Sequence, residues 1–198
     1  QINPHFFFNT VNMIYQQAIL EKADITVEMI EKMTECMRYT LSQNTRISNL
    51  AMELNFMRNY LYIQNRRFEG RIEFILEEER ELPNIKIPAM IIEPLVDNAI
   101  KHGFSNTESG GLVVIHVECK DDQVIIHVSD NGKGMSAVAL EQLIMNQYKC
   151  ASQGENLGLY NLMRRLDMYY SKAAKITVNS YEDCGFDAVI TIPVMKGW

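Results

Sequence analysis

The sequence is most informative at Glu93-Pro-Leu-Val-Asp-Asn-Ala-Ile-Lys-His-Gly103, which has the spacing of an amphipathic helix. Asn98, Lys101 and His102 share one helical face, and the apolar residues share another, namely Ile92, Leu95, Val96, Ala99 and Ile100. An amide oxygen can ligate a hard cation without adding charge, and a lysine can bind a phosphate oxygen. The polar face therefore suits a magnesium-bound polyphosphate, although a solvated helix face would show the same pattern.

A second segment, Asp130-Asn-Gly-Lys-Gly-Met135, directly follows the strand-like run 124–129. The strand delivers a carboxylate at its end, and Gly132 and Gly134 let the backbone turn close to a ligand. A buried Asp130 can accept a hydrogen bond from an exocyclic amine such as that of adenine. An ordinary turn can carry the same residues.

A third segment, Gly154-Glu-Asn-Leu-Gly-Leu-Tyr-Asn161, opens a helix with an apolar stripe of Leu159, Leu162, Leu166 and Tyr169. A glycine-containing loop at a helix N-terminus presents free N–H groups and a positive dipole end to phosphate. The alternative is a plain junction between a loop and a helix.

In this order the three segments resemble the N, G1 and G2 boxes of the gyrase/Hsp90/histidine kinase/MutL ATP-binding superfamily. The resemblance implies ATP and Mg²⁺ as ligands and a Bergerat-type fold. It further implies that Asn98 holds magnesium, that Asp130 reads adenine and that residues 135–156 form a mobile lid. The other nucleotide contacts that it implies are Lys101, His102, Gly103, Gly132, Gly134, Met135, Gly154, Asn156, Leu157, Gly158 and Leu159.

The N-terminal run Gln1-Ile-Asn-Pro-His-Phe-Phe-Phe-Asn-Thr-Val-Asn12 resembles the Q-I-N-P-H-F-L-F-N-x-L-N segment of the LytS/YesM-type sensor histidine kinases. Further matches at 60–68, 87–88 and 94–103 extend the resemblance over essentially the whole chain. It implies that His5 takes the γ-phosphate of ATP and passes it to an aspartate of a response regulator, and that the full-length protein is a homodimer. Physically, neutral imidazole is a competent nucleophile near neutral pH.

Two further residues are candidates for roles in the reaction. Asn9 lies one helical turn after His5, and by analogy with other histidine kinases it is a candidate to orient a water; a surface amide is the alternative. Asp97 is a candidate to assist proton transfer from His5, because no acid follows His5 directly. His116 and His127 alternate with apolar residues, so we expect them at packing or surface positions.

Phe7 and Val11 stand where the family usually has leucine, and three positions of the ATP-binding part also differ from residues found in relatives. Asn156 replaces the middle glycine of the third box, and Phe186 stands where threonine is usual. Pro94 occupies the position at which hydrolytic members such as gyrase carry a glutamate, which disfavours hydrolysis of ATP by water. Two alternatives to a kinase stay open: a nucleotide-binding signalling module without kinase activity, and a hydrolytic ATPase of the same superfamily.

The predicted fold class is α+β in two parts: a helical dimerisation and phosphotransfer region at 1–69, truncated at its N-terminus, and an ATP-binding two-layer α/β sandwich with a mixed sheet at 70–198. Asp24 and Ser48 are the expected helix N-caps. In the second part helices are expected near 88–103, 136–145 and 158–171, and strand-like runs at 71–78, 113–117, 124–128, 176–181 and 186–193.

The composition of the 198 residues is that of a globular protein, with 47% hydrophobic and 22% charged residues. A net charge of −6 argues against nucleic acid as a partner. The four cysteines form no CxxC pair, so we expect reduced thiols in a cytoplasmic compartment. No apolar run reaches the roughly 18–20 residues of a membrane span. Because a motif begins at Gln1, we expect the cytoplasmic portion of a longer, membrane-anchored protein.

Overall fold

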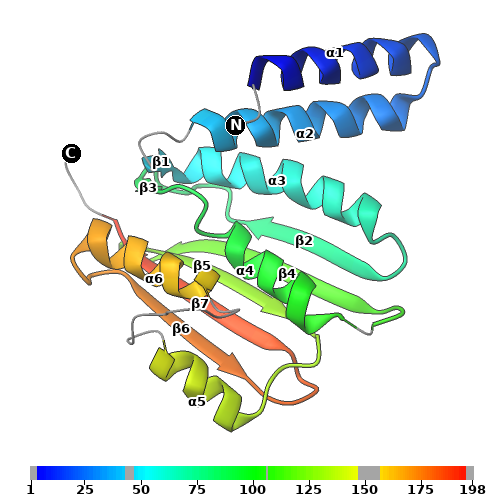
Figure 1. Ribbon diagram of the computed structural model, residues 1–198. Helices are drawn as coiled ribbons and strands as arrows, with labels where there is room; N and C mark the ends of the chain where they lie inside the picture. Colours follow the sequence, from blue (N-terminus) through cyan, green and yellow to red (C-terminus); the bar gives the residue numbers. More distant parts are fainter. Residues whose placement is uncertain (1–3, 43–46, 106, 147–156, 195–198) are drawn as a thin grey trace.

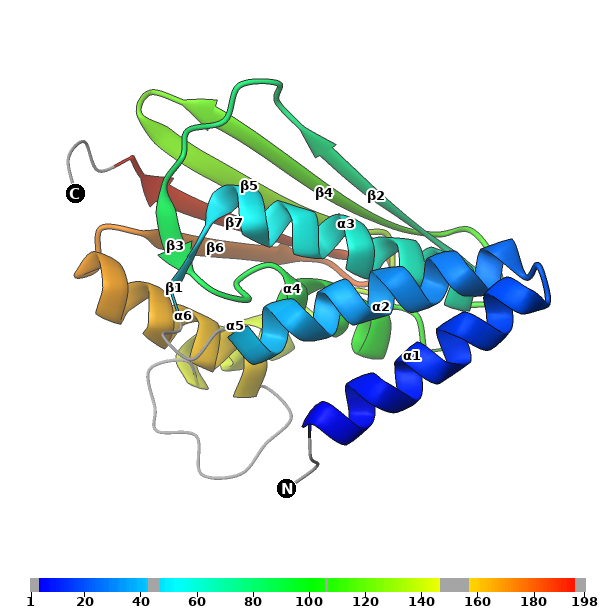
Figure 2. The same cartoon turned by 90° about the horizontal axis from the view of Figure 1, so that it is seen from above.

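The computed structural model describes residues 4–42, 47–105, 107–146 and 157–194. Three long helices precede a five-stranded sheet: α1 (Pro4–Leu20), α2 (Asp24–Ser42) and α3 (Leu50–Arg67). They lie as successive layers, with α3 next to the sheet and α1 outermost (Figures 1 and 2). No helix in these described ranges is both long and apolar enough to cross a bilayer.

The large sheet is mixed and has the strand order β2-β4-β5-β7-β6. Only β2 and β4 pair in parallel, whereas the other neighbours are antiparallel. The bounds are Ile72–Glu78 for β2, Gly111–Lys120 for β4, Gln123–Asp130 for β5, Lys175–Ser180 for β6 and Phe186–Pro193 for β7. This topology confirms the predicted α+β class with a mixed sheet.

Helices cover one face of this sheet (Figure 2). They are α3, then α4 (Glu93–Asn98) with the π-helix η1 (Ala99–Gly103), and α6 (Leu157–Tyr170); α5 (Ala137–Asn146) contacts β6. Every second residue of β4 is buried against them, as the period of two requires. One continuous core therefore joins α3 to the sheet, with members that include Leu54, Met57, Val113, Ile115, Leu162 and Ile190.

A separate apolar cluster holds α1 against α2, and its buried members are Val11, Ala18 and Ile30. Helix α1 contains no acidic residue and no lysine or arginine. It exposes large apolar side chains to solvent, including Phe6 at 68%, Met13 at 73% and Leu20 at 77%. We call these three residues, together with Ile14, the α1 apolar surface. The division into parts at residue 69 stays a prediction.

Local structure differs from expectation in the segments that flank α3 and α4. The short strands β1 (Ile47–Asn49) and β3 (Lys86–Pro88) pair with each other and were not predicted. The helix expected from residue 88 begins at Glu93, because Pro88 ends β3 and Met90 has a left-handed φ of 56°.

Two expected helix caps also differ. Ser48 is not the N-cap of α3, because it lies inside β1 and the Asn49 side chain caps the helix by accepting from the N–H of Met52 at 2.8 Å. Asp24 is the first residue of α2 instead of the flanking position, a difference of one residue.

The Asn49 cap gives a first prediction. Asn49→Ala leaves the N–H of Met52 without its side-chain acceptor, so the free energy of unfolding should fall by about 1 kcal/mol. Asn49→Asp keeps an acceptor oxygen and serves as the matched control. Urea unfolding of the three proteins measures the difference. Equal stability of the alanine and aspartate variants would contradict this assignment of the cap.

Candidate functional site

A cavity of about 440 Å³ opens where α4 and η1 meet the loop after β5 and the start of α6. The three predicted segments converge on it. The first contributes Pro94, Leu95, Asp97, Asn98, Lys101 and His102; the second contributes Gly134 and Met135; the third contributes Gly158 and Leu159. The chain thus gathers polar and glycine-rich segments that are far apart in the sequence into one hollow.

Asp130 lies at the end of β5 and is 9% exposed. It is not among the residues that line the cavity, but it is hydrogen-bonded to Phe186, which is. Its Oδ1 accepts hydrogen bonds from the N–H of Gly132 at 2.8 Å and of Phe186 at 3.3 Å. Burial raises the pKa of this carboxyl, and the two N–H donors act in the opposite direction. Within the described ranges Oδ2 has no hydrogen-bond partner, so it can accept from a ligand amine.

Backbone packing explains the glycines of the second segment. A Cβ built on Gly132 would lie 2.6 Å from the Cα of Gly103, and the N–H of Lys133 donates to the carbonyl of Gly103 at 3.0 Å. Gly134 has a φ of 59°, and a Cβ there would lie 1.9 Å from the carbonyl oxygen of Tyr181. A side chain at Gly132 would push the loop away from η1, and one at Gly134 would push it away from the turn between β6 and β7.

The polar face of α4 and η1 carries an ion pair. Lys101 contacts the carboxylate of Asp97 one turn earlier, and this hydrogen bond raises the pKa of Lys101. Asn98 and His102 are half-buried and line the cavity beside them. The last turn is a π-helix, which was not predicted; single π turns inside helices are frequent at functional sites.

Two charged residues of the cavity lining were not among the predicted site residues, namely Glu93 and Lys133. Burial, and secondarily the nearby Asp97 carboxylate, raise the pKa of Glu93. Glu93 lies four residues before Asp97, and residues four apart share a helix face, so this spacing was the signal in the sequence that could have identified Glu93. Phe186, singled out as a departure from the family pattern, is buried and forms part of the wall.

His5 lies apart from this cavity. It is exposed in the first turn of α1, and its Nδ1 lies 3.3 Å from the side-chain nitrogen of Asn9, so these two predicted residues are neighbours. The residues that line the cavity include neither of them. Helices α2 and α3 separate α1 from the sheet in both views (Figures 1 and 2).

Some predicted positions fall outside the described ranges. They are Gly154, Asn156 and the part 147–156 of the expected lid; α5 occupies residues 137–146 of it. Leu157 is described only as the first residue of α6. Among the described residues no group of three His, Cys, Asp or Glu side chains could hold a metal, and Cys36, Cys119 and Cys184 are free thiols.

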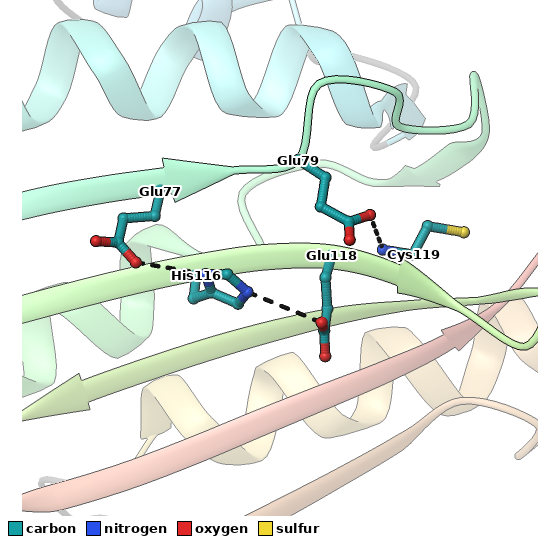
Figure 3. A network of polar contacts seen from close by, with 5 residues as sticks. All are labelled: Glu77, Glu79, His116, Glu118 and Cys119. Atoms are coloured by element: carbon teal, nitrogen blue, oxygen red, sulfur yellow. Dashed lines mark hydrogen bonds and ion pairs between the residues drawn. The ribbon is translucent and has the colours of Figure 1, made fainter.

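The opposite face of the sheet carries the two strand histidines. His116 lies between Glu77 and Glu118, with ring nitrogens 3.5 and 3.9 Å from their carboxylates (Figure 3). His127 is its cross-strand neighbour and contacts Asp187. Both are partly exposed, as expected for surface positions, and they lie on the side of the sheet away from the helices.

The burial of Asp130 yields a prediction for stability against pH. A carboxyl whose folded pKa is raised above its ordinary 3.8 binds its proton more tightly in the folded than in the unfolded protein. Its contribution to stability therefore falls as pH rises from the ordinary pKa through the raised one. Asp130→Asn keeps an acceptor oxygen without the charge. At pH 7 the unfolding free energy of Asp130→Asn should equal or exceed that of the wild type. The difference between the two unfolding free energies should become smaller towards pH 4. A loss above about 1 kcal/mol at pH 7 in urea unfolding would contradict this.

Two family models match successive parts of the chain. Residues 85–196 match the model of the histidine kinase-, DNA gyrase B- and HSP90-like ATPases, and residues 1–72 match the histidine kinase model. The chain is 30% identical over 197 residues to the sensor protein kinase HptS of Staphylococcus aureus, in strains RF122/ET3-1 and USA300, and spans 38% of their length.

Two solved structures share the fold. One is the histidine kinase domain of the blue-light activated histidine kinase of Erythrobacter litoralis, with a TM-score of 0.52, 17% identity, and coverage of 98% of this chain and 89% of that one. The other is the catalytic domain of histidine kinase ThkA, with a TM-score of 0.55, 20% identity, and coverage of 74% and 97%. The chain belongs to the histidine kinase-, DNA gyrase B- and HSP90-like ATPase family and has the architecture of a LytS/YesM-type sensor histidine kinase.

Proposed function

We propose that the chain binds Mg-ATP in the cavity described above and transfers its γ-phosphate to His5, from which the phosphate passes to an aspartate of a response regulator. The observation that carries the proposal is the convergence of the three segments on one cavity, with the buried Asp130 hydrogen-bonded to the lining residue Phe186. An anchor segment outside these 198 residues would hold such a protein at the membrane, with this part in the cytoplasm.

The donors around the cavity fit a magnesium triphosphate. Oδ2 of Asp130 can accept from the adenine amine, and the neutral amide oxygen of Asn98 can ligate the cation. Lys101 and Lys133 supply positive charge for the phosphates, and the N-terminus of α6 at Gly158 supplies backbone N–H groups. When bound, the cation neutralises phosphate charge and orients the triphosphate for in-line displacement.

The transfer forms a P–N bond to the imidazole of His5 while the bond between the γ-phosphorus and the bridging oxygen of ADP breaks. The proton of the attacking imidazole must pass to a base. Asp97 stays the candidate, and Glu93 is a second carboxylate in the same cavity with a raised pKa. Asn9 lies close enough to His5 to orient the ring or a water.

Transfer requires His5 to reach a cavity that it does not line. The α1 apolar surface supports delivery by a second copy of the chain, because an uncharged helix with Phe6, Met13 and Leu20 largely exposed is expected to pack against another helix. A homodimer would bury this surface. The His5 side chains would then be presented on a shared helical bundle.

Hydrolysis of ATP remains a second candidate because of one observation. Pro94 stands where hydrolytic members carry glutamate, but Glu93 beside it places a carboxylate on the cavity wall. A base there could direct water at the γ-phosphate. After reaction with γ-labelled ATP, label on the protein would indicate transfer, whereas labelled free phosphate would indicate hydrolysis.

Nucleotide affinity tests the role of Asp130. Asp130→Asn replaces a carboxylate acceptor by an amide, and the loss of a charged hydrogen bond worth about 1.5–3 kcal/mol should weaken Mg-ATP binding about 10- to 100-fold. Asp167→Asn on the exposed face of α6 is the matched control and should bind as the wild type does. An unchanged dissociation constant for Asp130→Asn in a calorimetric titration would contradict the adenine assignment.

Incubation with γ-labelled ATP tests the transfer itself. We expect acid-labile, base-stable label on the wild-type protein and none on His5→Gln. His116→Gln is the matched control, since His116 lies on the opposite face of the sheet, and it should accept label normally. Release of free phosphate without labelled protein would favour the ATPase. Bound but intact ATP would favour a signalling module, and label on His5→Gln would move the acceptor elsewhere.

A further inference from the structure

The segment Ala89–Ile92 connects β3 to α4, and buried side chains hold it from two sides. We call it the 89–92 strap. On one side lies Glu53 of α3, which is fully buried at 0% exposure. Its Oε1 accepts from the N–H groups of Ile91 at 2.8 Å and Ile92 at 3.2 Å, and its Oε2 accepts from Met90 at 2.9 Å. A single carboxylate thus binds three successive backbone donors.

On the other side lies Arg165 of α6. Its Nη1 donates to the carbonyl of Ala89 at 2.8 Å, and its Nη2 donates to the carbonyl of Met90 at 2.9 Å. The strap therefore lies between Glu53 of α3, which accepts hydrogen bonds from its N–H groups, and Arg165 of α6, which donates hydrogen bonds to its carbonyls. Arginine suits this role because its planar fork presents two donors in fixed geometry.

The strap has a strained backbone at its centre. Met90 has a φ of 56°, in the left-handed region that residues with a Cβ rarely adopt. Such conformations persist where the surroundings determine them, and they cluster at functional positions. Here both polar groups of Met90 are engaged, its N–H by Glu53 and its carbonyl by Arg165.

The same carboxylate reaches the helical region. The hydroxyl of Tyr39 on α2 donates to Oε2 of Glu53. Burial, followed by the charge of Glu53, raises the pKa of Tyr39, so the hydroxyl keeps its proton and stays a donor at neutral pH. Hydrogen bonds therefore run without a break from α2 through α3 to the strap.

Both helices that flank the nucleotide cavity are connected to this strap. Helix α4 starts directly after it and contributes Glu93, Asp97 and Asn98 to the cavity, whereas α6 carries Arg165 two turns after Gly158 and Leu159. Neither Glu53 nor Arg165 is part of the cavity lining. Their contacts set where α4 stands relative to α6, and hence the width of the space between them.

We propose that Glu53 and Arg165 are positioning residues for the nucleotide site: by fixing the 89–92 strap they set the cavity for ATP and couple it to the helical region through Tyr39. The inference rests on the proposed nucleotide binding. Coupling of this kind is reciprocal, so bound nucleotide should also make the strap more ordered.

Arg165→Lys is the sharpest variant, because a lysine retains the charge and loses the two-donor fork. Arg164→Lys is the matched control: it is the adjacent residue, exposed on the same helix, and the contacts that fix the strap do not involve it. In a titration with Mg-ATP, the dissociation constant of Arg165→Lys should rise about five-fold or more, which is within the usual range of coupling between sites. The dissociation constant of Arg164→Lys should equal that of the wild type.

Binding amplitude separates positioning from mere loss of stability. A variant that is only partly folded binds fewer equivalents with an unchanged dissociation constant. Arg165→Lys and Glu53→Gln should instead bind a full equivalent with a raised constant, and their phosphorylation rate should recover at saturating ATP. Tyr39→Phe should show a smaller rise, because it leaves the strap contacts of Glu53 in place.

Hydrogen exchange gives a readout without any variant. Saturating Mg-ATP should slow exchange of the N–H groups of Met90, Ile91 and Ile92 in the wild-type chain. Unchanged exchange there, or full-amplitude binding by Arg165→Lys with the wild-type constant, overturns the inference while the proposed function stands. A wild-type chain that does not bind Mg-ATP overturns both.

Discussion

The approach of Gly132 to Gly103 is the constraint on which the geometry of the candidate site depends. No side-chain atom fits between these backbones, since a Cβ on Gly132 would lie 2.6 Å from the Cα of Gly103. The contact fastens the end of η1 to the loop after β5. As a result, the polar face that carries Asn98 and His102 opens onto the same hollow as the residues that flank Asp130. The sheet supplies a rigid base, because β5 lies in its centre.

Local signals predicted most of this arrangement. The period of two identified the strands, and the spacing of apolar residues identified α4 and α6. The convergence of the Asn98, Asp130 and Gly158 segments followed from resemblance, since no local rule brings together residues sixty positions apart. The pairing of Lys101 with Asp97 was within reach, because residues four apart on a helix are neighbours.

What the sequence could not show depends on tertiary contacts. Glu53 occupies the apolar stripe of α3 between Leu50 and Met57, which is unusual for a carboxylate, but its backbone partners lie more than thirty residues away. Strands β1 and β3 are three residues each, too short for a period to register. The π turn of η1 differs from an α-helical turn in its backbone hydrogen bonds, and no change in residue type indicates this difference in the sequence.

The two apolar clusters indicate how the parts of the chain can move. Helix α3 shares the continuous core of the sheet, whereas α1 packs on α2 through a separate small cluster. Moving α1 with His5 therefore disturbs little buried surface, whereas moving α3 would open the main core. Helix α1, which carries His5, is thus the least constrained of the three, and α3 stays fixed to the segment before α4 through the fully buried Glu53. Because Tyr39 joins α2 to that same carboxylate, a shift of α2 reaches α4 through three hydrogen bonds instead of through the packing of the sheet. Polar contacts break over shorter displacements than apolar packing does, so this connection can switch between discrete states while the core remains intact.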